Sequence, residues 1–367
     1  MSITRETLPL LGFGAMRLPL LPSGKVDMEH TKAMVDYYMQ SGMNYFDTAY
    51  MYHEGESELI VKEAVTKRYP RESFILADKL PIWSVKEKAD VSKIFNEQLE
   101  KCGVDYFDYY LLHALNTKNS DLCEEFGAYE YMLDMKKQGK IKHFGFSFHG
   151  KAECIEYILA AHPEMEFVQL QLNYFDWLGD HKPIYEIALK YNKPIIIMEP
   201  VRGGMLTKLP PAVEKMFLDA NPNASPASWA MRWVAELDGV VNVLSGMSNM
   251  QQLQDNIATL KNPAPLTASE REIINQAAQT LQNMPLIPCT ACNYCKTCPE
   301  GLPIADILDM YNEFQQKGRG LFGLNQRHKK MEGKTALDCT GCGICSPICP
   351  QAIDIPEVIS QIKTLLS

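Results

Sequence analysis

Short apolar runs alternate with amphipathic stretches from the N-terminus to about residue 280. Runs such as Tyr109–Leu112 and Ile195–Met198 are almost continuously apolar, as expected for parallel strands buried on both faces. The stretches between the runs carry apolar residues at helical spacing. The pattern predicts eight strand–helix units. The expected strands are residues 11–17, 43–46, 74–79, 106–113, 142–147, 167–173, 194–199 and 240–245, and the expected helices are 28–41, 56–69, 86–102, 122–138, 151–161, 183–191, pieces of 203–235, 250–260 and 269–282.

Eight such units in this length are typical of an α/β fold of the (β/α)8 TIM-barrel type, which takes about 250 residues. A doubly wound open sheet is the alternative. It is disfavoured because no Gly-x-Gly-x-x-Gly follows the first strand. Prolines at 285 and 288 end the last barrel helix. We therefore expect a barrel domain at residues 1–284 and a small, mainly α-helical domain at residues 285–367.

The composition narrows the choice of partners and compartment. The 367 residues carry a net charge of −9, so the chain lacks the basic face that nucleic acid binding requires. Its apolar runs are far shorter than the roughly 20 residues of a membrane span. The first residues have no apolar core of signal-peptide length. We expect a cytoplasmic protein that binds neither nucleic acid nor membrane.

Eight of the eleven cysteines lie in two stretches near the C-terminus. The second stretch has the spacing Cys-x2-Cys-x2-Cys-x3-Cys-Pro of bacterial ferredoxins, and the first is one residue shorter before its last cysteine. The residues that follow each stretch repeat at the same offsets, which indicates an internal duplication. The eight cysteines are Cys289, Cys292, Cys295, Cys298, Cys339, Cys342, Cys345 and Cys349.

These stretches resemble two-cluster ferredoxins, in which the fourth cysteine of each run binds the other cluster. The resemblance implies two [4Fe–4S] clusters, with Cys349 completing the first set and Cys298 the second. Zinc is the alternative, although zinc sites usually use separated Cys-x2-Cys pairs. Disulfides would require an exported chain. The remaining Cys102, Cys123 and Cys154 are scattered and are expected to be small buried side chains.

Polar residues follow three neighbouring strands at the rim where a barrel places its chemistry. Asp47 and Tyr52 follow the second strand, Lys79 ends the third and His113 ends the fourth. An ammonium beside a phenol favours the phenolate and lowers the phenol's pKa. A histidine can donate a hydrogen bond to a carbonyl oxygen. Singly, each residue could be structural, for example Asp47 as a helix cap. Together, they predict proton transfer to a carbonyl.

This order of motifs resembles the aldo-keto reductase family over residues 8–260. The resemblance rests on Asp-Thr-Ala-x-x-Tyr, Gly-Glu-Ser-Glu, the strand-three lysine and Leu-Leu-His. It implies that Tyr52 is the proton donor, that Lys79 lowers its pKa, that Asp47 supports Lys79 and that His113 orients the substrate. The whole chain resembles the subgroup with a C-terminal ferredoxin-like domain.

The same resemblance implies an NADP or NAD cofactor. Ser147 and Gln169 would hold the nicotinamide carboxamide, and Met198 stands where an aromatic ring often stacks on the nicotinamide. Phe148 replaces an asparagine that is common in the family. The adenosine end would lie at Gly246, Met247, Ser248, Gln252 and Asn256. Gly246 and Gln252 occupy positions that often carry the cations for a 2′-phosphate, so the choice between NADPH and NADH stays open.

Three functions follow from this reading. The first is an oxidoreductase that acts on a small-molecule carbonyl or alcohol and uses the clusters as a second redox device. The second is an electron-transfer protein that passes reducing equivalents through the clusters to a redox partner protein. The third is a reductase with purely structural clusters. A nicotinamide gives two electrons as a hydride, whereas each cluster takes one, and no flavin site is recognisable in the sequence.

Overall fold

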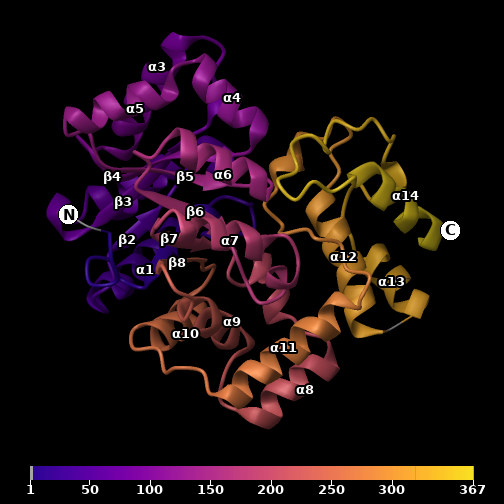
Figure 1. Cartoon of the computed structure of the whole chain (residues 1–367). Coiled ribbons are helices and arrows are strands. Elements are labelled where there is room, and N and C mark those ends of the chain that lie inside the picture. The colour runs from indigo at the N-terminus through magenta and orange to yellow at the C-terminus, as the bar shows by residue number, and fades with distance from the viewer. Residues whose placement is uncertain (1–2, 319, 367) are drawn as a thin grey trace. The chain divides into compact units, whose positions relative to one another are not determined.

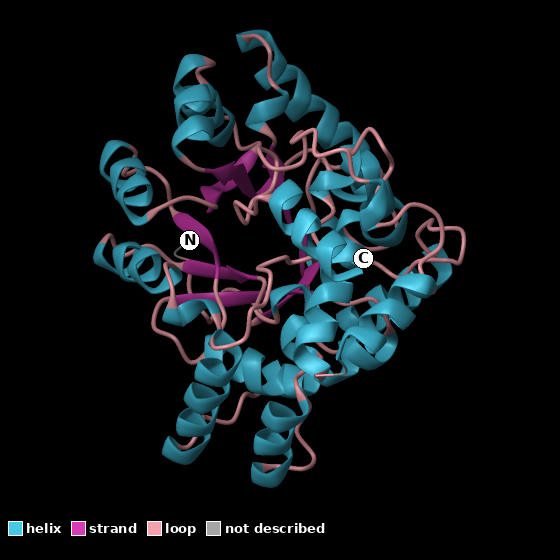
Figure 2. Cartoon of the chain, turned by 90° about the vertical axis from the view of Figure 1, so that its right-hand side faces the viewer, coloured by secondary structure: helices cyan, strands magenta, loops and turns pink. Residues whose placement is uncertain are grey.

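The protein contains eight parallel strands that close into a barrel. The structure is a computed structural model, and it describes residues 3–318 and 320–366. Each strand pairs with the next, and β1 pairs with β8 to close the ring. Figure 1 shows the strands surrounded by helices, and Figure 2 shows them from the side. The predicted TIM barrel is confirmed.

The strands agree with the apolar runs of the sequence to within a few residues. They are β1 (Leu11–Gly14), β2 (Tyr45–Asp47), β3 (Ile75–Leu80), β4 (Phe107–Leu115), β5 (Ile141–Phe148), β6 (Phe167–Gln171), β7 (Ile195–Met198) and β8 (Val240–Gly246). The helices are α1 (Met28–Gln40), α2 (Ser57–Val61), α3 (Lys88–Cys102), α4 (Thr117–Glu125), α5 (Ala128–Lys137), α6 (Ala152–Ala161), α7 (His181–Lys190), α8 (Pro211–Ala220), α9 (Pro226–Ala235), α10 (Met250–Leu260), α11 (Ala268–Gln282), α12 (Ile304–Lys317), α13 (Gly320–Lys329) and α14 (Ile355–Leu366).

Two predicted helices differ from the observed ones. The single helix expected at 122–138 is two helices, because Gly127 adopts a left-handed φ of 66° between α4 and α5. An α-helix cannot continue through that conformation. The helix expected at 56–69 is α2 followed by one π-helical turn at residues 62–66. In both regions the helical segments still bury one face and expose the other.

The chain divides into two compact units. Unit 1 comprises residues 1–200 and 230–266, and unit 2 comprises residues 201–229 and 267–367. Unit 2 therefore includes the segment that leaves β7, as well as α11, which lies beside α8 (Figure 1). The predicted sequence boundary at 284/285 lies inside unit 2. No helix among the described residues is long and apolar enough to cross a membrane.

Unit 2 has its own apolar core, to which both halves of the cysteine duplication contribute. Ile304 and Ile307 of α12 pack with Ile355 and Ile359 of α14 in one buried cluster. Several of the motif cysteines border this cluster. The apolar residues that repeat after each motif in the sequence thus form one shared core.

Gly145 of β5 lies close to the backbone of the neighbouring strand β6. A Cβ added there would lie 2.5 Å from the Phe167 carbonyl oxygen of β6. We expect Gly145→Ala to lower the free energy of unfolding by about 1–3 kcal/mol, the usual cost of overpacking. Gly179→Ala is the control, because its methyl group would make only ordinary contact with Asp176. Thermal unfolding followed by circular dichroism measures both, and equal melting of the two variants would contradict the expectation.

Candidate active site and cluster sites

Four side chains predicted from the sequence meet at the C-terminal ends of β2, β3 and β4. Lys79 is fully buried, and its Nζ donates to Asp47 Oδ1 at 2.7 Å and to the Thr48 carbonyl at 2.7 Å. The same Nζ lies 5.3 Å from the centroid of the Tyr52 ring. The rings of Tyr52 and His113 are 6.2 Å apart and meet edge to face. The structure thus brings the four residues together.

A bulge at the end of β4 positions His113. The pairing of β4 with β5 shifts between Leu112 and Leu115, and Ala114 has a left-handed φ of 52°. The Ala114 N–H donates to Ser147 Oγ at 2.7 Å, so the bulge is tied to β5. Bulges often re-aim a side chain beside an active site. Here the bulge directly follows the histidine.

Burial dominates the electrostatics of the site. Burial raises the pKa of Asp47, and the Lys79 ammonium partly offsets this effect. Burial lowers the pKa of His113 well below its usual value, with smaller contributions from Lys79 and from nearby His149. His113 is therefore neutral at physiological pH and keeps one ring N–H as a hydrogen-bond donor.

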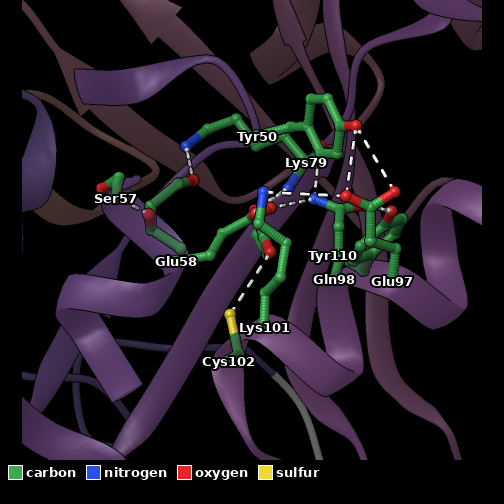
Figure 3. Close-up of polar contacts among 11 residues, drawn as sticks. Tyr50, Ser57, Glu58, Lys79, Glu97, Gln98, Lys101, Cys102 and Tyr110 are labelled. Carbon is green, nitrogen blue, oxygen red and sulfur yellow. Dashed lines mark hydrogen bonds and ion pairs between the residues drawn. The ribbon is translucent and has the colours of Figure 1, made fainter. Parts of the chain in front are cut away.

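A second polar layer, not predicted from the sequence, lies behind Lys79 between β3, α2 and α3 (Figure 3). Gln98 of α3 donates through Nε2 to the Lys79 carbonyl at 3.0 Å and to Glu58 Oε1 at 2.9 Å. The Tyr110 hydroxyl donates to Gln98 Oε1. Lys101 Nζ forms an ion pair with Glu58 Oε2 at 2.7 Å. The layer holds the backbone of Lys79 from outside the barrel.

Asp78 completes this layer. Its Oδ1 accepts from the Lys79 N–H at 2.8 Å, and its Oδ2 accepts from the Cys102 thiol at 3.6 Å. Asp78 and Glu58 are both fully buried and hydrogen-bond to each other. Burial, and then the Glu58 charge, raise the pKa of Asp78 well above its usual value. Burial and the repulsion between the two carboxylates thus favour one proton on the pair, with Asp78 in its neutral form.

The residues expected at the nicotinamide lie on β5, β6 and β7. Ser147 pairs with Gln169 across the two neighbouring strands, and Gln169 Nε2 lies 3.6 Å from Met198 Sδ. Gln169 Oε1 is buried and has no hydrogen-bond partner among the described residues. Such an acceptor is costly unless a ligand satisfies it. The NH2 group of a carboxamide is a suitable donor, so these residues fit a nicotinamide.

The residues expected at the adenosine end follow β8. Asn256 of α10 donates through Nδ2 to Ser245 Oγ at 2.9 Å. Gln252 Oε1 accepts from the Ser248 N–H at 2.8 Å, and Met247 is fully buried. Hydrogen bonds between the loop after β8 and α10 thus fix the conformation of this loop.

Arg17 is a cation at this end that the sequence did not single out. Its side chain lies over Gly246, where an added Cβ would meet Arg17 carbons at 2.9–3.0 Å. Its Nη2 forms an ion pair with Glu199 Oε1 at 2.9 Å. Its carbonyl accepts from Ser248 Oγ at 2.9 Å. Arg17, which ends the first predicted strand, therefore contacts residues at the ends of β7 and β8. These residues lie close together only in the closed barrel.

Trp83 and Trp177, which lie in the loops after β3 and β6, have different surroundings. The rings of Trp83 and His113 are 5.0 Å apart, so Trp83 borders the candidate site. Trp177 instead packs on Tyr185 and Trp233, and Trp233 is only half-buried. The apolar wall beside His113 thus comes from the loop after β3.

In unit 2, four cysteines line one cavity. They are Cys289, Cys292 and Cys295 of the first motif and Cys349 of the second. Burial raises the pKa of Cys295 to about 12, and the other three thiols add to the effect. Cys298 lies near Cys345, Cys339 and Cys342 and likewise raises the pKa of the Cys345 thiol, after burial. This grouping is the one that crossed ligation requires.

The two motifs also share their backbone conformation. Ala291 and Asn293 have left-handed φ values of 51° and 62°, and Gly341 and Gly343 at the same motif positions have 74° and 80°. The Ala291 N–H donates to Cys289 Sγ at 3.4 Å. Left-handed residues in such loops help to form anion-binding concavities of the kind found at iron–sulfur sites. Among the described residues, no three side chains of metal-binding type converge on a single metal ion. The thiolates of a cluster instead bind different iron atoms.

Comparison with known proteins identifies both parts of the chain. The model of the aldo/keto reductase family matches residues 10–279, which is most of the chain. The chain belongs to the aldo/keto reductase family. A 4Fe-4S dicluster domain matches residues 288–354. The protein is therefore an oxidoreductase of this family that carries a ferredoxin-like iron–sulfur domain.

Its relatives are distant in sequence. An uncharacterized oxidoreductase YqkF of Bacillus subtilis is 25% identical over 280 residues, which cover 66% of this chain and 86% of the relative. An NADH-specific methylglyoxal reductase of Escherichia coli is 21% identical over 77% of this chain and 98% of its own length. A solved aldo-keto reductase from Klebsiella pneumoniae in complex with NADPH shares the fold, with a TM-score of 0.59 and 18% identity over 75% of this chain and 94% of that one.

The Asp78–Glu58 pair of this reductase barrel predicts an unusual pH dependence of stability. Because the pKa of Asp78 is raised in the folded state, the folded state holds a proton that the unfolded state releases near pH 4. Asp78 therefore costs stability as the pH rises above that value, up to about 1.4 kcal/mol per pH unit. Asp78→Asn mimics the protonated acid and removes this cost. We expect its advantage over the wild type to grow between pH 5.5 and 8.5 in urea unfolding.

Asp36→Asn is the matched control. Arg68 and Tyr69 hydrogen-bond to Asp36 and hold its pKa below the usual value, against the opposing effect of partial burial. The ionised Asp36 carboxylate stabilises the folded state fully at pH values above its pKa in the unfolded chain, and this stabilisation is lost only in acid. The stability difference caused by Asp36→Asn should therefore stay constant over the same pH range. The same constant difference for Asp78→Asn would contradict the shared-proton interpretation.

Proposed function

We propose that the protein is an NAD(P)H-dependent carbonyl reductase in which Tyr52 donates the proton. The observation that carries the proposal is the buried Asp47–Lys79 ion pair beneath the Tyr52 ring. A buried ion pair is a poor device for stability alone. It is well suited to hold an ammonium next to a phenol. When bound, a reduced nicotinamide would supply a hydride to the carbonyl carbon.

The proton comes from a residue of the chain itself, and neighbouring residues stabilise the charge that remains. The Tyr52 hydroxyl gives its proton to the carbonyl oxygen as that oxygen becomes an alcohol. The Lys79 ammonium stabilises the negative charge that remains on the phenol oxygen, and Asp47 holds Lys79 in place. Neutral His113 donates its ring N–H to the carbonyl oxygen and so orients the substrate. The Trp83 ring beside His113 favours substrates with an apolar group next to the carbonyl.

Gln169 Oε1 and Ser147 would hold the carboxamide, with Met198 beside them. The loop after β8 would hold the adenosine end of either NADPH or NADH. Arg17 is the cation beside this loop, but it is paired with Glu199. A relative is named for specificity toward NADH, and a structural neighbour contains NADPH.

We expect Tyr52→Phe to lower the rate of carbonyl reduction by at least about 100-fold, because general acid catalysis contributes about 10²–10⁴-fold. NADPH or NADH oxidation with methylglyoxal and with 4-nitrobenzaldehyde measures the rate. Tyr50→Phe is the control, since Tyr50 contacts Glu97 and lies outside the proton path. Unchanged iron content shows that the protein is intact. Full activity of Tyr52→Phe would show that the barrel performs other chemistry.

We also propose that the second domain holds two [4Fe–4S] clusters with crossed ligation. Cys289, Cys292, Cys295 and Cys349 would bind cluster one. The support is that these four cysteines line one cavity. Cys298, Cys339, Cys342 and Cys345 would bind cluster two, and their mutual proximity supports this set. The cysteine-rich domain fits a reducing compartment such as the cytoplasm.

Pairs of single substitutions test the crossing. We expect Cys292→Ala and Cys349→Ala, which lie in different motifs, to remove the same EPR signal from the dithionite-reduced protein. Cys342→Ala and Cys298→Ala should together remove the other signal. If instead each signal follows one motif, the clusters are not crossed. Measured iron per chain distinguishes the loss of one cluster from the collapse of the domain.

A further inference from the structure

The duplication in unit 2 is symmetric in its backbone but not in its charges. Asn312 lies eight residues after Ile304 in α12, and Lys363 lies eight residues after Ile355 in α14. The two residues therefore occupy the same position in the two halves. Both reach the chain segment that enters a cysteine motif, but one side chain is neutral and the other is cationic.

In the second half the helix supplies a cation. Lys363 Nζ donates to the carbonyl oxygen of Cys339, the first cysteine of that motif, at 2.6 Å. In the first half the amide of Asn312 instead bonds both backbone groups of Ile287, accepting from its N–H at 2.8 Å and donating to its carbonyl at 2.9 Å. Helix α12 thus anchors its cysteine loop without contributing charge.

A different segment brings a cation to the first half. Arg202 belongs to the stretch of residues 201–229 that leaves β7 and joins unit 2. Arg202 and Gly203 both have left-handed backbones, with φ values of 49° and 64°. The Gly203 backbone lies so close to Thr290 that an added Cβ would be 2.2 Å from the Thr290 carbonyl oxygen. Thr290 follows Cys289, so this turn packs directly on the first cysteine loop.

The Arg202 side chain is only 3% exposed. Arg202 directly precedes Gly203, and its Nη1 lies 3.5 Å from Met205 Sδ, so the buried guanidinium stays within the turn that packs on the first cysteine loop. Four thiolates around a cluster would bring negative charge close to this buried cation.

We propose that Arg202 and Lys363 set the reduction potentials of the two clusters separately, Arg202 for cluster one and Lys363 for cluster two. Each cluster takes one electron, which here comes from dithionite, and gains one negative charge. A nearby cation stabilises the reduced form and raises its potential. This inference rests on the cluster assignment proposed above.

EPR-monitored redox titration of the full-length, iron-replete protein tests the proposal. Arg202→Gln should lower the midpoint potential of the signal that Cys292→Ala removes and leave the other unchanged. Lys363→Gln should do the reverse. Arg202→Lys, which keeps the charge, should retain most of the potential, so a merely structural role for the arginine would be distinguishable. Lys208→Gln is the control, because Lys208 lies in the same segment but is 72% exposed, and it should shift neither signal.

A shift of both signals by Arg202→Gln, or of neither at full iron content, would overturn the role of Arg202. If Arg202→Gln loses its cluster, Arg202→Lys and Lys363→Gln still decide the question through their own potentials. If Cys292→Ala and Cys349→Ala remove different signals, the crossed assignment fails instead. The potentials of the Arg202 and Lys363 variants would then still show whether each cation acts on a single cluster.

Discussion

The barrel's candidate site depends on one buried ion pair. Lys79 and Asp47 are both removed from water, which costs several kcal/mol for each ion. Good geometry and additional hydrogen bonds must offset that cost. Nζ has two acceptors at 2.7 Å, and Gln98 and Asp78 hold the backbone of Lys79. The second polar layer is thus a consequence of placing a charged lysine at the end of β3.

Unit 2 follows a different constraint, because its cysteine loops are shaped around thiols rather than by regular secondary structure. The left-handed residues recur at matching positions, and the duplicated helices α12 and α14 share one core. The two halves differ where the segment after β7 packs on the first cysteine loop. A residue outside the duplication can therefore give the first half a positive charge. The second half obtains its positive charge from its own helix.

The sequence predicts the features that depend on local pattern. Buried parallel strands are continuous apolar runs, and residues at strand ends must share a rim, so the barrel and the meeting of Asp47, Lys79 and His113 could be predicted. Arg202, Arg17 and Asp78 could not be predicted in this way. Their roles come from partners that lie close only after folding, such as Thr290, Gly246 and Glu58. The break at Gly127 was missed because a single glycine interrupts an otherwise helical pattern.

The reactions proposed for the two domains transfer different numbers of electrons in one step. This difference limits how the two domains could exchange electrons. In the proposed function, hydride transfer at the barrel would move two electrons at once, whereas each cluster would accept one. Direct exchange between a nicotinamide and a cluster needs a group that splits the pair, and the sequence contains no recognisable flavin site. Because a nicotinamide would supply both electrons of the proposed carbonyl reduction, that reaction requires none from the clusters.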